Sequence, residues 1–303
     1  MQPEPLLDLP PALLYPFAFL FGSLWGSFLN VCIVRLPKAL SVMWPASHCP
    51  KCQAPIRGYV NIPVFSYLLL RGKCRACKVP ISARYPLVEL LMGMLTLALV
   101  HRFGVSFTTL AYFVLTMGLL VVTFIDVEYW IIPNEISYGL WLVGLGVSFV
   151  PGATVQPLDA FIGFAAGAVG LFLVAWLFLK LRGVEGLGDG DWKLLGGLGA
   201  FLGWRMLPLV LFLAAVQGVA VAGVVYALRR GKPLEPAPLP EDESEESTDA
   251  PAEVPARLAE VDGPPPGRLA LPFGPFLALG ALELVFFGDA IVRFVESIAG
   301  GRG

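Results

Sequence analysis

The sequence predicts an all-α polytopic membrane protein with about eight transmembrane helices and a cytoplasmic zinc-ribbon-like loop. Hydrophobic residues make up 56% of the 303 positions, and the mean hydropathy is +0.73. Only 15% of the residues are charged, whereas soluble domains carry about 25%. Apolar runs recur along the chain, and four cysteines lie in two close pairs on one basic loop. The composition therefore excludes an ordinary soluble domain.

The apolar runs are bounded by charges and by Gly and Pro, and they define the expected helices in order. The predicted spans lie near 12–34, 86–101, 107–125, 136–151, 158–180, 192–204, 206–228 and 272–288. The sixth is short and Gly-rich, which indicates a tilted, re-entrant or shielded helix. Residues 1–11 contain no Lys or Arg, unlike a cleavable signal peptide, so we expect the first helix to remain in the mature protein.

The first long loop sets the expected orientation. Residues 35–84 contain nine Lys and Arg residues and no Asp or Glu, so the positive-inside rule predicts that this loop is cytoplasmic. Alternating the spans then puts Asp126, the run 188–191 and the loop after Arg229 on the same side. Ionisable groups at apolar helix ends are costly and mark functional sites.

The basic loop carries the motifs Cys49-Pro50-Lys51-Cys52 and Cys74-Arg75-Ala76-Cys77. Thiolates at i and i+3 of a tight turn fit adjacent corners of a tetrahedron, so two such knuckles predict a structural Cys₄ zinc site. The alternative is a pair of disulfides, which a reducing cytosol disfavours. We interpret Cys32 as a packed residue of the first span and His48 as a loop residue.

Pro233 to Pro266 differs from the rest of the chain because it is rich in Pro, Glu, Asp, Ser and Ala. Such a segment buries too little apolar area to fold, so we expect a disordered acidic linker. An alternative is that it attracts a basic substrate segment. The expected organisation is then as follows: an N-terminal transmembrane helix (1–34), a Cys₄ loop (35–85), a catalytic helical bundle (86–228), the acidic insert (229–268), and a last helix with the C-terminus (269–303).

Two carboxylates at helix ends suggest a membrane aspartyl protease. Asp126 follows the apolar run 119–125, and Gly188-Asp189-Gly190-Asp191 opens the next span expected on that side. A close pair in a low dielectric shares one proton, which suits peptide hydrolysis. The physical argument alone leaves open whether Asp126 and Asp191 merely end helices, and whether Asp189 competes for the role. Glu128, Glu135 and Glu185 are interpreted as solvated helix ends.

The motifs resemble those of the type IV prepilin peptidases, membrane aspartyl proteases of the Gly-x-Gly-Asp class. The blocks that carry the resemblance span most of the chain outside the acidic insert. They are 26–37, the cysteine loop to Pro86, Asp126 with Ile132-Pro133-Asn134, 188–195 and 272–276. The resemblance implies that Asp126 and Asp191 are catalytic and leaves Asp189 at the variable position.

The resemblance also implies the substrates and the location. The expected substrates are prepilins and pseudopilins with a basic leader and an apolar helix, cut at the cytoplasmic face of a bacterial inner membrane, with no nucleic-acid partner. Many members also methylate the new N-terminus with S-adenosylmethionine, but the sequence has no strand followed by GxGxxG, so this cofactor rests on the resemblance. The competing interpretations are a transporter, which would need polar residues in several spans, and an inactive zinc-ribbon scaffold.

Overall fold

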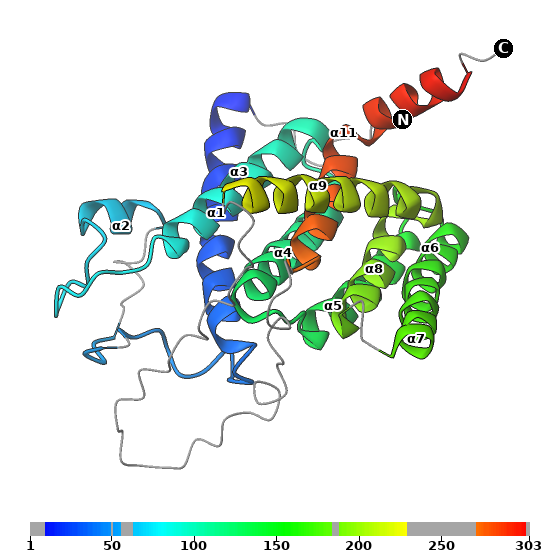
Figure 1. Ribbon diagram of the computed structural model, residues 1–303. Coiled ribbons are helices and arrows are strands. Elements are labelled where there is room, and N and C mark those ends of the chain that lie inside the picture. The colour runs from blue at the N-terminus through cyan, green and yellow to red at the C-terminus, as the bar shows by residue number, and fades with distance from the viewer. Residues whose placement is uncertain (1–9, 50, 56–62, 184–187, 229–270, 301–303) are drawn as a thin grey trace.

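The computed structural model describes residues 10–49, 51–55, 63–183, 188–228 and 271–300 (Figure 1). Within these ranges every regular element is helical, apart from two isolated β-bridges in the cysteine loop. The predicted acidic insert (229–268), Glu185 and most of the N-terminal segment 1–11 lie outside the described residues.

All eight predicted spans are helices. Their bounds are α1 Pro11–Arg35, α3 Arg84–Phe103, α4 Phe107–Tyr129, α5 Asn134–Ser148, α6 Pro157–Ala165 continuing through a π-helical turn into α7 Leu171–Arg182, α8 Asp189–Leu202, α9 Leu207–Leu228 and α11 Gly274–Gly300. The short helix α2, Phe65–Leu69, within the cysteine loop was not among the helices predicted from the sequence.

Six helical segments of the described chain are long and apolar enough to cross a membrane. They are α1, α3, α4, the continuous segment Pro157–Arg182, Trp204–Leu228 and Gly274–Ser297. The remaining two predicted spans, α5 and α8, have 15 and 14 residues. The chain is therefore a multi-pass membrane protein in which two short helices pack among longer ones.

Helix α4 lies at the centre of the bundle and packs against α1, α3, α5 and α11 (Figure 1). In its spanning window 67% of the residues are buried, the largest share of the six candidate spans. The side chains of Leu115, Leu119, Val122 and Ile125 are fully inaccessible. A rigid central helix of this kind fixes the position of residues at its ends, including Asp126.

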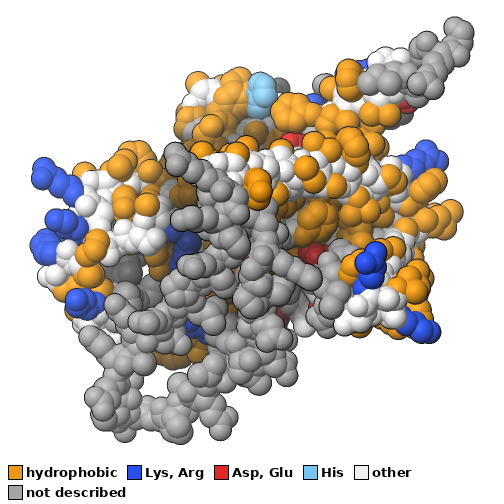
Figure 2. Space-filling view, in the orientation of Figure 1, with side chains coloured by type: hydrophobic (Ala, Val, Ile, Leu, Met, Phe, Trp, Pro, Cys, Tyr) orange, Lys and Arg blue, Asp and Glu red, His pale blue; other side chains and the backbone are white. Residues whose placement is uncertain are grey.

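Two groups of helices flank α4. On one side α1 packs along α3, and on the other α8 packs against α5 and α6 (Figure 1). Helices α6 and α8 touch at Gly163 and Gly199, where a Cβ on Gly199 would lie 2.1 Å from the Gly163 carbonyl oxygen. Small residues allow membrane helices to approach at backbone distance. Hydrophobic side chains cover much of the exterior, as expected for surfaces facing lipid (Figure 2).

Candidate active site

Asp126 lies in the last turn of α4, which ends because Trp130 adopts the left-handed conformation (φ +59°). The Trp130 N–H donates to the Asp126 carbonyl oxygen at 3.0 Å and closes the helix. The Asp126 residue is only 5% exposed. Its Oδ2 accepts a hydrogen bond of 2.9 Å from the backbone N–H of Gly274, the first residue of α11. Asp126 thus joins the end of α4 to the start of α11.

Asp191 lies in the first turn of α8, where Gly188 is the N-cap residue. The Gly188 N–H donates to Asp191 Oδ2 at 3.2 Å, the reciprocal half of a capping box. Asp191 is 6% exposed. Helix N-termini carry a partial positive charge, so this carboxylate is placed where the backbone favours negative charge.

Ile132 follows the end of α4 and lies against the first turns of both α8 and α11. A Cβ added to Gly190 would lie 2.4 Å from the Ile132 Cβ, and one added to Gly274 would lie 3.1 Å from the Ile132 Cδ1. Ile132 therefore contacts both α8 and α11, and the glycines leave the space that its side chain occupies. Asp126 and Asp191 therefore lie at adjoining helix ends around Ile132. The structure thus brings together the two carboxylates that the sequence analysis singled out.

Two buried carboxylates within each other's field cannot both be ionised without a large cost, so such a pair holds one proton. One member is then able to accept a proton while the other donates one. This combination suits general acid–base chemistry on a polar bond brought to the end of the bundle.

Asp189 has a different environment from Asp191. Its side chain is 78% exposed and accepts a hydrogen bond from the Trp192 Nε1 at 3.1 Å. It also pairs with Lys193, one helical turn further on, which is itself buried. The exposed carboxylate of Asp189 therefore neutralises the buried ammonium group of Lys193, whereas the carboxylate of Asp191 is itself buried.

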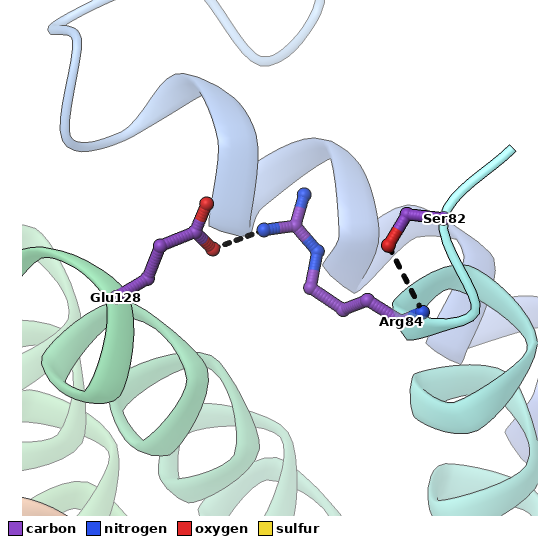
Figure 3. Close-up of polar contacts among 3 residues, drawn as sticks. All are labelled: Ser82, Arg84 and Glu128. Atoms are coloured by element: carbon purple, nitrogen blue, oxygen red, sulfur yellow. Dashed lines mark hydrogen bonds and ion pairs between the residues drawn. The ribbon is translucent and has the colours of Figure 1, made fainter. Parts of the chain in front are cut away.

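An ion pair connects the cysteine loop to the helix that carries Asp126. Arg84 at the start of α3 and Glu128 in the last turn of α4 point toward each other (Figure 3). The Arg84 backbone N–H also donates to Ser82 Oγ at 3.3 Å (Figure 3). Glu128 was interpreted from sequence as a solvated helix end, but it pairs with Arg84 and its side chain is 30% exposed.

A second contact fixes the loop against α3. Glu89 is 6% exposed, and its Oε2 accepts a hydrogen bond of 2.7 Å from the Val64 N–H, immediately before α2. Because a buried carboxylate needs such partners, Glu89 and Val64 set the position of α2 relative to the membrane helices.

The two cysteine knuckles have the same local structure. In each, the first cysteine N–H donates to a carbonyl five residues later: Cys49 to Ala54 at 3.0 Å, and Cys74 to Val79 at 2.8 Å. The residue four positions after each first cysteine, Gln53 or Lys78, has positive φ. The repeat places the second cysteine of each pair in an equivalent position, so the two knuckles form matching halves of one site.

The four sulfur atoms of Cys49, Cys52, Cys74 and Cys77 all lie within 4.8 Å of one another, and the thiols are free. The Cys49 and Cys77 Sγ atoms are 3.8 Å apart, and a tetrahedron with metal–sulfur distances of about 2.3 Å has edges of about that length. The donor set therefore fits a tetrahedral divalent metal. Hydrogen bonds from the backbone N–H groups of Cys77 and Ala76 lower the pKa of the Cys74 thiol to about 6, whereas desolvation and the neighbouring cysteines raise the pKa of the Cys77 thiol to about 11.

Neither of the other candidates on this part of the chain joins the cluster. Cys32 is buried within α1. His48 is exposed, and its Nδ1 lies 3.0 Å from the Ala46 carbonyl oxygen.

The fold and site define a multi-pass membrane protein with a buried carboxylate pair and a four-cysteine loop. Two family models match the chain: the bacterial peptidase A24 N-terminal domain over residues 20–103 and the type IV leader peptidase family over residues 113–223. The first contains Cys49 to Cys77, and the second contains both Asp126 and Asp191.

Curated relatives cover nearly the whole chain, and each is named prepilin leader peptidase/N-methyltransferase. The Aeromonas hydrophila protein is 35% identical over 94% of this chain and 94% of its own length. The Burkholderia pseudomallei (strain 1026b) protein is 37% identical over 92% of this chain and 87% of its own length. The Myxococcus xanthus (strain DK1622) protein is 36% identical over 93% of this chain and 92% of its own length. No solved structure matches the chain. The chain belongs to the type IV leader peptidase family.

Sequence reasoning found both carboxylates and all four clustered cysteines, but it assigned no role to Gly274, Arg84 or Glu89. The block 272–276 was noted as a match to the family pattern, which was the available signal for Gly274. Its hydrogen bond to Asp126 joins residues 148 positions apart, so only the folded chain reveals that contact.

Proposed function

We propose that this protein removes the basic leader peptide from type IV prepilins and pseudopilins and methylates the N-terminus that cleavage exposes. The observation that carries the proposal is the buried pair Asp126 and Asp191, held at adjoining helix ends in a chain of this family. Peptide hydrolysis by two carboxylates needs this environment, because burial and mutual repulsion keep one proton on the pair.

In the proposed mechanism Asp126 and Asp191 act as a unit. The ionised carboxylate removes a proton from a water molecule as that water attacks the scissile carbonyl carbon. The protonated carboxyl group donates a hydrogen bond to the carbonyl oxygen and then its proton as the tetrahedral intermediate forms. The proton accepted from water is transferred to the leaving amine nitrogen as the C–N bond breaks. One hydroxyl of the intermediate returns its proton to the other carboxylate as the new carboxyl group forms, so the pair ends the cycle with one proton, as it began.

The charge distribution supports a cytoplasmic site in the bacterial inner membrane. The basic loop between α1 and α3 belongs on the cytoplasmic side by the positive-inside rule. The Arg84–Glu128 ion pair links the end of that loop to the last turn of α4, which carries Asp126. A prepilin whose basic leader stays in the cytoplasm would present the junction between leader and apolar helix at this same face.

Methyl transfer is proposed from the family relationship and the names of the relatives. S-adenosylmethionine would supply the methyl group, and the uncharged amine released by cleavage would accept it. We assign no residue of this chain to the cofactor.

We propose zinc as the metal of the cysteine cluster and a structural role for it. Cys49, Cys52, Cys74 and Cys77 would supply all four ligands, which leaves no open position for substrate or water. The metal would cross-link the two knuckles of the loop. We also propose the organisation inferred from sequence, in which the loop (35–85) precedes a catalytic bundle (86–228) and the acidic insert (229–268) separates that bundle from the last helix.

Co-expression with a prepilin tests the function directly. Mass spectrometry of the prepilin should show loss of the leader and an added methyl mass on the new N-terminus when this protein is present, and an intact leader with an empty vector. Cleavage without methylation would remove the second activity from the proposal. An intact leader with folded enzyme, for every prepilin of the host, would contradict it.

A further inference from the structure

In the described part of the chain, the side chain of Asp126 accepts a hydrogen bond from Gly274, the first residue of α11. The two residues are 148 positions apart in the sequence. The Gly274 N–H lies 2.9 Å from Asp126 Oδ2, and both residues are buried. The first N–H groups of a helix have no partner within that helix, and Pro275 has no N–H at all. A buried donor left without an acceptor is costly, so Gly274 and Asp126 satisfy each other.

Space, rather than backbone conformation, restricts position 274 to glycine. Gly274 begins the α-helix α11, and its φ does not lie in the left-handed region. Alanine could therefore adopt this backbone conformation. An added Cβ, however, would lie 2.6 Å from Asp126 Oδ2 and 3.3 Å from its carboxyl carbon. The carboxylate would have to leave its position.

We propose that Gly274 is a positioning residue for the peptidase reaction: its N–H and its missing side chain together hold the Asp126 carboxylate in place at the end of α4. This inference rests on the proposed function, in which the two carboxylates act together. Gly274 does not itself touch the substrate in this account. Gly274 acts on the reaction through Asp126. Its replacement should therefore change the rate of the chemical step rather than the binding of the substrate.

The variant Gly274→Ala tests the proposal, with Gly288→Ala as its matched control. Both sites lie on α11, but a Cβ at Gly288 meets nothing within 4 Å. We expect Gly274→Ala to lower kcat for leader cleavage by about 10- to 100-fold, since displacing a reacting group by about 1 Å costs about that much. KM should stay within about twofold, and Gly288→Ala should match wild type. An unchanged kcat, or a change confined to KM, would overturn the proposal.

A third variant separates crowding of Asp126 from crowding of Ile132, whose Cδ1 would lie 3.1 Å from the same added Cβ. Removing that methyl group with Ile132→Val in the Gly274→Ala protein should not restore kcat. Recovery of the rate measured for Ile132→Val alone would assign the effect to Ile132 and contradict the role of Asp126.

A stability measurement tests the contact without relying on activity. Gly274→Ala should lower the Tm of the purified protein in detergent, and it should lower the Tm much less in an Asp126→Ala background, where the obstructing carboxylate is absent and only Ile132 is crowded. Equal losses of Tm in both backgrounds would contradict the proposed contact. Failure of wild-type protein to cleave any prepilin would instead count against the proposed function and leave this stability cycle unaffected.

Discussion

At the scale of single residues, burial distinguishes the acids of the Gly-Asp run. Asp191 is 6% exposed and accepts the N-terminal hydrogen bond of its own helix. Asp189 has a side chain that is 78% exposed and pairs with Lys193. Two aspartates only two positions apart on α8 thus face different surroundings, because neighbouring positions along a helix point in different directions.

We predict that Asp189→Asn keeps leader cleavage within about twofold of wild type, because the side chain lies outside the carboxylate pair. The variant should lower the free energy of unfolding by about 1 to 3 kcal/mol, because the buried ammonium group of Lys193 loses its carboxylate partner. Cleavage kinetics and thermal unfolding of purified protein measure the two effects. A loss comparable to that of Asp191→Asn would show that the acids had been assigned the wrong way round.

At the scale of helices, the ends of α3, α4, α8 and α11 determine the site. Apolar runs in the sequence predicted where these helices lie, because each must bury or expose a continuous apolar surface. The lengths of α5 and α8, and the π-helical turn between α6 and α7, depend on how neighbouring helices pack. The contacts of Ile132 with Gly190 and Gly274 join three segments distant in sequence, and no local pattern encodes them.

The Arg84–Glu128 ion pair couples two such helix ends. We predict that Arg84→Glu and Glu128→Arg each lower leader cleavage, because each puts two like charges side by side between the loop and the last turn of α4. The double variant restores opposite charges, so it should recover most of the lost activity. Each partner is partly exposed, at 20% and 30%, so the coupling free energy should be about 1 kcal/mol.

A double-mutant cycle in detergent measures that coupling from thermal unfolding, alongside the cleavage rates. Additive losses in the double variant would mean that the ion pair does not connect the loop to α4. The swap keeps the net charge and the residue types of the wild type, which makes it a close control for each single change.

At the scale of the whole molecule, the chain combines a membrane bundle with a loop that carries a four-cysteine cluster. Spacing alone predicted the cysteine cluster, because two Cys-x-x-Cys turns supply four ligands wherever the loop allows them to meet. Spacing could not predict how the loop attaches to the bundle. That attachment uses Glu89 with Val64, and Arg84 with Glu128, which become neighbours only when α1, α3 and α4 pack.

We predict that purified wild-type protein contains one zinc ion per chain and that the double variant Cys49→Ser/Cys74→Ser contains none. Loss of the metal should loosen the loop and lower the Tm, while cleavage falls only in part because the carboxylates lie elsewhere. Elemental analysis of protein purified under reducing conditions measures the metal, and Cys32→Ser is the matched control for loss of a thiol. Wild-type protein without zinc would contradict the assignment.

The central claim is that Asp126 and Asp191 act as one catalytic pair. The measurement that tests it most directly is the rate of leader cleavage by purified Asp126→Asn and Asp191→Asn proteins, each with its Tm recorded. The account predicts a loss of at least about 100-fold in each variant, because an amide can neither accept nor donate the required proton, with folded protein in both cases. Wild-type cleavage by either folded variant would contradict the two-carboxylate mechanism.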